Sequence, residues 1–119
     1  MTDPFDRQEL LEELDGDIEF LAESVEILEE DAPKLLLDIR SAIDAQDAQA
    51  AATAAHTLKS MVGNFCASSA YEAALQIETD GKAGDLSGCR TGLTELEHEI
   101  ERLQAALAEF LQETERAAE

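Results

Sequence analysis

The chain contains few aromatic residues and few residues that interrupt helices. Among its 119 residues there are no tryptophans, one tyrosine, four phenylalanines and two prolines. Alanine, leucine, glutamate and glutamine fill the sequence instead, and long runs of β-branched residues are absent. Because these residues favour helices over strands, the composition predicts an all-α protein. The length suits one domain, 1–119, which can bury roughly two-thirds of its extended-chain surface without disulfides or metals.

Basic residues are also scarce, and long hydrophobic runs are missing. Eight lysines and arginines stand against 28 aspartates and glutamates, which gives a net charge of −20. A surface this negative repels polyanions, so we expect neither nucleic acid nor an anionic membrane as a partner. No stretch is long and apolar enough to span a bilayer, and "MTDPFDRQELLEELDGD" has no hydrophobic signal-peptide region. We therefore expect a cytoplasmic protein with a neutral or locally basic partner.

Residues that bind metals are few and poorly spaced. Cys66 and Cys89 lack metal-ligand spacing, and no export signal supports a disulfide, so we expect two buried thiols. A di-iron helical bundle needs two Glu-x-x-His pairs on facing helices. "ELEH" supplies one pair, Glu95 with His98, but Thr53 stands where His56 would need its glutamate. We expect no metal site and place His98 on a solvated face.

The hydrophobic pattern predicts two long helices. Apolar residues recur at alternating spacings of three and four, as in a helix with one buried face, over about 17–45 and from 86 to 110. Within the first segment the phase continues across Pro33, which favours one helix kinked near that residue over two separate helices. The second helix is expected to fray in the final "ETERAAE".

Capping residues mark the starts of the remaining helices. They predict helices over about 6–16, 47–65 and 69–82, followed by a turn at 81–85. Together the segments predict an antiparallel, up-down four-helix bundle with a short N-terminal helix as a lid, and a core over about 6–111. The expected caps are Asp6 with Glu9, Asp47 alone, and Ser69 with Glu72.

The segment "AAHTLKSMVGNF", residues 54–65, carries one of only two histidines. At 100° per residue, His56 lies opposite Leu58 and the rest of the apolar stripe, so we expect an exposed imidazole. Lys59, one turn later, supplies positive charge beside it. A glycine inside a helix, such as Gly63, costs roughly 1 kcal/mol of helix stability relative to alanine. Two reasons could offset this cost: close approach by another protein, or tight packing against a neighbouring helix.

The motifs that would indicate an autonomous enzyme are missing. There is no phosphate-binding glycine-rich loop, no Ser/Cys–His–Asp set and no nucleotide-binding motif, which excludes a complete histidine kinase. An exposed neutral imidazole can still act as a nucleophile toward a phosphoryl group. Phosphoryl transfer depends mainly on positioning and charge neutralisation, and a partner protein holding a metal could supply both.

The sequence "AAHTLKSMVGNFCA" resembles the signature of histidine-containing phosphotransfer domains, roughly A-H-x-L-K-G-x-x-G-N-φ-G-A with φ apolar. The resemblance implies a bundle that carries phosphoryl groups between aspartates of receiver domains, with Mg²⁺ on the receiver, no cofactor on this chain, and a monomer. It implies His56 as the phospho-acceptor and Lys59 as the residue that stabilises phosphoryl charge. Ser60 and Cys66 stand where the family usually has glycine. The expected surrounding positions are Ala52, Ser60, Gly63, Asn64, Ala67 and Glu78.

Two alternatives remain open from the sequence. The first is a helical adaptor with the same fold that docks receiver domains without accepting a phosphoryl group, and the second is the metal-binding bundle. The sequence fits a free-standing protein and a module of a hybrid histidine kinase equally well. Labelling by a phosphorylated receiver distinguishes the adaptor from the phosphotransfer module.

Overall fold

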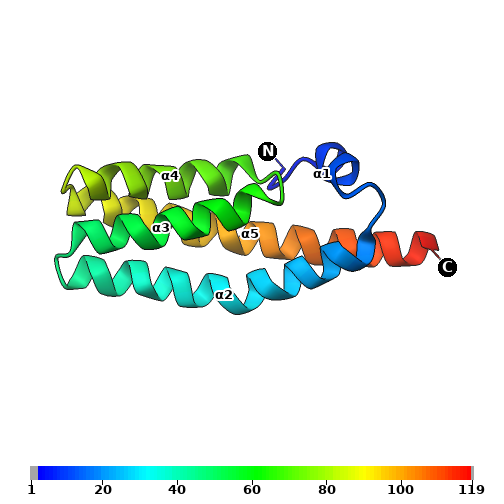
Figure 1. The fold of residues 1–119 in the computed structure, drawn as a ribbon, viewed down its shortest axis with the longest axis horizontal. Helices are drawn as coiled ribbons and strands as arrows, with labels where there is room; N and C mark the ends of the chain where they lie inside the picture. The colour runs from blue at the N-terminus through cyan, green and yellow to red at the C-terminus, as the bar shows by residue number, and fades with distance from the viewer. Residues whose placement is uncertain (1–2, 119) are drawn as a thin grey trace.

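The computed structural model describes residues 3–118, which form five helices and no strand. They are α1 (Arg7–Leu14), α2 (Ile18–Asp44), α3 (Ala48–Gly63), α4 (Ser68–Lys82) and α5 (Leu86–Ala118). Helices α2 to α5 lie side by side, while α1 stands at one end of the molecule (Figure 1). Each of α3 and α5 packs against both α2 and α4. The all-α helical bundle predicted from the sequence is confirmed, and none of the helices in residues 3–118 is suited to crossing a bilayer.

Helix α2 runs without interruption through Pro33, as the continuous hydrophobic phase predicts. Asp17 caps its N-terminus, because the Asp17 carboxylate accepts a hydrogen bond from the Phe20 N–H at 3.0 Å. Pro33 lies on the exposed side of the helix, where water can solvate the carbonyl that its ring leaves without a partner. The ribbon of α2 bends partway along its length (Figure 1).

The N-terminal segment is tied to the loop between α3 and α4. Asp6 caps α1 by accepting from the Glu9 N–H at 3.0 Å, as predicted. The N–H of Asp6 donates to the carbonyl of Cys66 at 3.1 Å. Phe5 is buried, and its ring packs edge-on against Phe110 with 5.5 Å between the ring centroids. The residues that lead into α1 are therefore fastened to the bundle by a backbone hydrogen bond from Asp6 and by the buried ring of Phe5.

The start of α4 differs from the prediction. The helix begins at Ser68 with Ala67 as its N-cap, and no side chain caps it, so the predicted capping box of Ser69 and Glu72 is wrong. Ala67 and Ala70 are each only 1% exposed. The packing of these two small side chains in the core determines where the first turn of α4 begins. Their burial outweighs the local preference for a serine as the N-cap.

Helix α5 also extends further than predicted. It continues to Ala118, whereas the sequence predicts fraying from Glu113; residue 119 lies outside the described residues. The Arg7 guanidinium contacts the Glu113 carboxylate at 2.8 Å and stands 5.5 Å from the Phe110 ring centroid. These contacts with the N-terminal segment support an additional turn of helix beyond the hydrophobic core.

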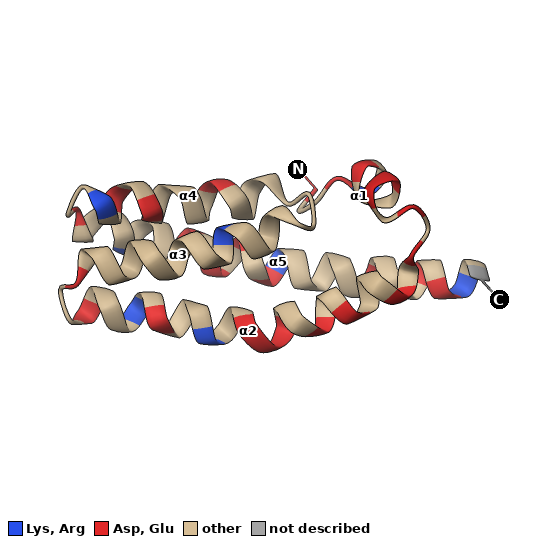
Figure 2. Ribbon diagram, in the orientation of Figure 1, with Lys and Arg blue, Asp and Glu red and all other residues tan. Residues whose placement is uncertain are grey.

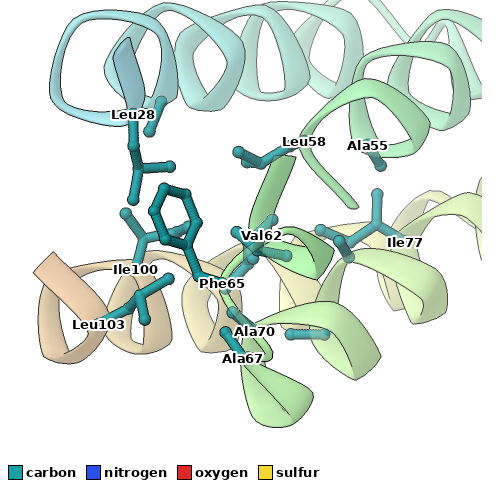
Figure 3. Close-up of a cluster of buried hydrophobic side chains, with 14 of the residues drawn as sticks. Leu28, Ala55, Leu58, Val62, Phe65, Ala67, Ala70, Ile77, Ile100 and Leu103 are labelled. Atoms are coloured by element: carbon teal, nitrogen blue, oxygen red, sulfur yellow. The ribbon is translucent and has the colours of Figure 1, made fainter. Parts of the chain in front are cut away.

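The buried face of α3 fixes the rotation of that helix. Its side chains meet residues from the three other long helices in one apolar cluster (Figure 3). Leu58 and Val62 are fully buried, and Ala55 lies on the same face. The opposite face of α3 is consequently presented to solvent. The partners drawn in the cluster are Leu28 of α2, Ile77 of α4, and Ile100 and Leu103 of α5.

Candidate functional site

His56 lies on the solvent-facing side of α3. Asp47 fixes the start of this helix, because its carboxylate accepts a hydrogen bond from the Ala50 N–H at 3.0 Å, as predicted. The helical phase then carries the imidazole away from the buried face that holds Leu58. The side chain of His56 is 60% exposed. The ring can therefore be reached by another molecule.

The carboxylate of Glu78 connects α4 to the two site residues predicted on α3, His56 and Lys59. Its Oε2 atom lies 2.6 Å from Nδ1 of His56, and its Oε1 atom accepts from Nζ of Lys59 at 2.7 Å. The Glu78 side chain is only 7% exposed, and that of Lys59 is 15% exposed. One buried carboxylate thus holds both the imidazole and the ammonium in place.

A close approach between α3 and α4 brings Glu78 to this position. Gly81 lies one turn after Glu78 and faces the first turns of α3. A Cβ atom at position 81 would stand 2.6 Å from the Ala48 carbonyl oxygen and 2.8 Å from Cβ of Ala52. Both distances are too short for any larger residue without movement of the backbone. Gly81 and the alanines of α3 therefore set the separation at which Glu78 can reach His56.

The electrostatics of the site keep Glu78 ionised. The hydrogen bond from Lys59 is the largest cause that lowers the pKa of the Glu78 carboxyl; burial opposes it and His56 adds to it. The same hydrogen bond raises the pKa of Lys59. An ionised carboxylate only accepts hydrogen bonds, so Nδ1 of His56 must carry the proton that it donates. In a neutral imidazole this leaves the lone pair on Nε2.

A second lysine contacts the same carboxylate. Nζ of Lys82 lies 3.7 Å from Oε2 of Glu78, one turn further along α4, and its side chain is 65% exposed. A cavity of about 330 Å³ adjoins His56 on this side and is lined by both Glu78 and Lys82. Lys82 was not among the residues predicted from the sequence. Its spacing of four residues from Glu78 is the signal that could have identified it.

Helix α3 carries no acidic residue, although the chain has 28 aspartates and glutamates. Lys59 is the one lysine or arginine of α3, and Figure 2 shows acidic positions spread over the other helices. The exposed face of α3 therefore adds no negative charge of its own to the surroundings of His56. An anionic group meets less repulsion at this helix than it would if the helix carried acidic residues.

Three further predicted residues are exposed on the same helix or at its end. They are Ser60, Gly63 and Asn64. The Ser60 hydroxyl donates to the carbonyl of His56 at 3.2 Å. Gly63 is the last residue of α3, and a Cβ atom added there would meet the Tyr71 ring at 3.5 Å, an ordinary contact distance. The fold does not require glycine at position 63, so the alternative of tight packing against a neighbouring helix gains no support.

Two predicted positions are not on the surface. Ala52 and Ala67 are each 1% exposed. The helical phase places Ala52 beside His56, but α4 covers that side of α3 at Gly81. Ala52 therefore lies at the surface only where it lines the cavity next to His56. Ala67 is buried in the core at the start of α4. The buried side chain of Ala67 is not placed to contact a partner, and Ala52 borders the surface only through the cavity beside His56.

An apolar hollow lies near the end of α3 and was not predicted. Its volume is about 360 Å³, and it is bordered by Met61 of α3 and by Asn64, which follows that helix, together with residues of α1 and α2. Two of its α2 side chains, Phe20 and Ile27, are 57% and 53% exposed. They are spaced seven residues apart and out of phase with the buried stripe of α2, which is the sequence signal that could have identified a second apolar face.

Metal-ligating residues gather at a different place from His56. Among residues 3–118, ligand atoms of Glu9, Glu13 and Cys66 lie within 4.8 Å of one another. Burial, with Glu13 and Glu9 adding to it, raises the pKa of the Cys66 thiol to about 12, so the thiol is protonated near neutral pH when no metal is bound. His98 and its sequence partner Glu95 are both exposed on α5. The metal-binding alternative, which needs ligands facing the bundle interior, gains no support.

The two cysteines differ in their surroundings. Cys89 is fully buried, and its thiol lies 3.7 Å from the Ile77 carbonyl oxygen. Cys66 is only partly buried, so the prediction of two buried thiols is correct for Cys89 and wrong for Cys66. The backbone of Cys66 has a φ of +55°. This left-handed conformation favours glycine, which accounts for the glycine that the resembling pattern has at the corresponding position.

Comparison with known families finds one match. The family model described as Hpt domain matches residues 23–106, which include all of α3 and α4 and most of α2 and α5. No curated protein matches the chain. No solved structure matches it either. The matched range contains the whole Glu78, His56, Lys59 and Lys82 cluster.

Proposed function

Because the chain belongs to the Hpt domain family, we propose that it is a histidine phosphotransfer module of a His–Asp phosphorelay. His56 accepts a phosphoryl group from an aspartate of one response-regulator receiver domain and passes it to an aspartate of another. Helices α2 to α5 serve as the antiparallel, up-down four-helix bundle that presents His56 to these receivers. The observation that carries the proposal is an exposed imidazole whose Nδ1 is held at 2.6 Å by an ionised carboxylate.

The transfer step follows from this arrangement. The lone pair on Nε2 of His56 attacks the phosphorus of a phosphoaspartate in line with the bond that breaks. The N–P bond forms while the P–O bond to the aspartate breaks, and the electron pair leaves with the aspartate carboxylate. The proton stays on Nδ1, so the ring becomes positively charged. Glu78 stabilises that charge from 2.6 Å, and the reverse reaction needs no proton to enter or leave.

The lysine of α3 contributes charge to the same site. Lys59 holds one oxygen of Glu78 at 2.7 Å and thereby offsets the negative charge beneath the ring. The receiver is expected to contribute a divalent metal, Mg²⁺, that neutralises the remaining phosphoryl charge. In this proposal the chain binds no cofactor of its own and acts as a monomer in the cytoplasm, where it meets free receivers or the receiver of a hybrid kinase.

The surface of α3 supports docking of a receiver domain. Ser60, Gly63 and Asn64 extend from His56 toward the apolar hollow bordered by Phe20 and Ile27. Because α3 carries no acidic residue, an anionic phosphoaspartate site meets little repulsion from this helix. Apolar side chains beside a weakly charged strip provide the contact area, and the exposed imidazole lies at its end.

The test is transfer from a phosphorylated receiver. The wild-type chain should acquire a label that is acid-labile and base-stable, as expected for phosphohistidine. His56→Gln should abolish the label while the helical circular dichroism stays unchanged, and His98→Gln, which removes the other histidine, should leave labelling intact. A chain that binds receivers without acquiring any label would contradict the proposal and favour the docking adaptor.

A further inference from the structure

The cavity beside His56 lies on the side of Lys82 and not of Lys59. Its volume is about 330 Å³, and its lining includes His56, Glu78 and Lys82 together with the polar side chains of Thr53 and Gln49. Lys59 does not border it. The imidazole of His56 and the side chain of Lys82 therefore border one open cavity, which the side chain of Lys59 does not reach.

The two lysines differ in their freedom to contact such a group. Lys59 donates to Glu78 at 2.7 Å, its side chain is 15% exposed, and its ammonium lies 5.7 Å from the Tyr71 ring centroid. Moving Lys59 to a phosphoryl group would break a short charge-assisted hydrogen bond to a buried carboxylate. Lys82 is 65% exposed and touches Glu78 only at 3.7 Å. It can turn toward the cavity at little cost.

The charges of the phosphorylated site call for a cation beyond Lys59. A phosphoryl group carries up to about two negative charges near neutral pH, and Glu78 contributes one more. The protonated ring and Lys59 together offset only two of these three charges. When no receiver with its Mg²⁺ is bound, one negative charge of the phosphorylated chain is left without a neighbouring cation unless Lys82 takes part.

We propose that Lys82 is the cation that contacts the phosphoryl oxygens on His56, while Lys59 acts as a positioning residue that holds Glu78. This inference rests on the proposed function of His56. It assigns the two lysines different tasks: one maintains the orientation of the imidazole, and the other binds the transferred group.

The test uses phosphoramidate, a small phosphodonor that needs no receiver domain, so docking effects do not enter. The intact chain is labelled as wild type, Lys82→Gln, Lys82→Arg and Lys59→Gln. Arg116→Gln, which removes one positive charge from the exposed end of α5, is the matched control. The rate of labelling is followed, and ³¹P NMR titration then reports the pKa of the phosphoryl group on each labelled protein.

Lys82→Gln should slow labelling roughly two- to fivefold, the effect of losing an exposed ion pair, and should raise the pKa of the phosphoryl group. Lys82→Arg should restore both values, and Arg116→Gln should change neither. An unchanged phosphoryl pKa in Lys82→Gln overturns the inference, as does a shift seen in Lys59→Gln alone. If wild-type His56 takes no label from phosphoramidate or from a phosphorylated receiver, the proposed function itself fails. This outcome is distinct from failure of the inference about Lys82, in which wild-type His56 is labelled but the Lys82 variants behave like wild type.

Discussion

Replacing Glu78 by glutamine removes one charge and leaves the shape of the side chain almost unchanged. Glu78 accepts from Nδ1 of His56 at 2.6 Å and from Nζ of Lys59 at 2.7 Å, and its side chain is 7% exposed. An amide has a single oxygen, so it can accept from only one of these donors with full strength, and its NH₂ group faces the other. The substitution therefore breaks the arrangement that keeps the proton on Nδ1.

Two magnitudes follow for Glu78→Gln. A hydrogen bond to a charged group contributes about 1.5–3 kcal/mol. Loss of this contribution from the transition state slows phosphoryl transfer roughly 10- to 150-fold. The free energy of unfolding should fall by about 1–3 kcal/mol, because the mostly buried ammonium of Lys59 loses its carboxylate. The first quantity is measured by labelling from phosphoramidate and the second by urea denaturation.

The pH dependence of stability gives an independent check on Glu78. Its pKa is lower in the folded chain than its ordinary value, chiefly because of Lys59. Its stabilising contribution is therefore complete above the ordinary carboxyl pKa, about 4.3, and is lost as the pH falls through the folded pKa. The difference in unfolding free energy between wild type and Glu78→Gln should be constant near neutral pH and should shrink below about pH 4.

The decisive measurement is the ¹⁵N NMR spectrum of His56, which distinguishes a proton on Nδ1 from one on Nε2. Wild-type His56 at a pH where the ring is neutral should carry its proton on Nδ1, and Glu78→Gln should lose this preference. Glu78→Asp, which keeps the charge but shortens the side chain, separates loss of charge from loss of contact. A wild-type ring protonated on Nε2, or a Glu78→Gln variant with an unchanged labelling rate, would refute the reasoning.

Three further predictions concern docking and the backbone. Gly63→Ala should keep or raise the free energy of unfolding, by up to about 1 kcal/mol, yet slow transfer from a receiver while labelling by phosphoramidate stays normal; unchanged receiver transfer would contradict a docking role. Cys66→Gly should be more stable in urea than Cys66→Ala by about 1 kcal/mol, because both remove the thiol but only glycine relieves the left-handed backbone; equal stabilities would count against strain. Ile27→Ser should weaken receiver binding, measured by calorimetry, by about 1–2 kcal/mol, whereas the exposed Leu37→Ser on the outer face of α2 should not; equal losses would rule out the hollow as the docking surface.

Much of the fold follows from local patterns that packing does not disturb. The alternation of three and four predicts α2 through Pro33, and the carboxylate of Asp47 predicts the start of α3, because each signal lies within one helix. The start of α4 was missed since burial of Ala67 and Ala70 determines it, and those contacts involve other helices. The last turns of α5 were missed for the same reason, because Arg7 contacts Glu113 across the whole length of the sequence.

The site shows the same division between local and long-range information. The exposure of His56 follows from the phase of α3 alone, but the burial of Ala52 does not, because a single apolar stripe describes only one buried face. Helix α3 buries a second strip under α4, where a residue larger than Gly81 would collide with the Ala48 carbonyl and with Ala52. This second contact is invisible to hydrophobic periodicity, since alanine and glycine contribute little to it.

That small-residue contact also determines what the histidine can do. If α4 stood further from α3, Glu78 could not lie 2.6 Å from Nδ1 of His56 while remaining 7% exposed. The imidazole would then lack both its fixed proton and the buried charge that stabilises the phosphorylated ring. The lysines would lose their common partner as well, because both contact Glu78. The reactivity proposed for His56 therefore depends on the packing of Gly81 against the first turns of α3 as much as on the residues that surround the ring.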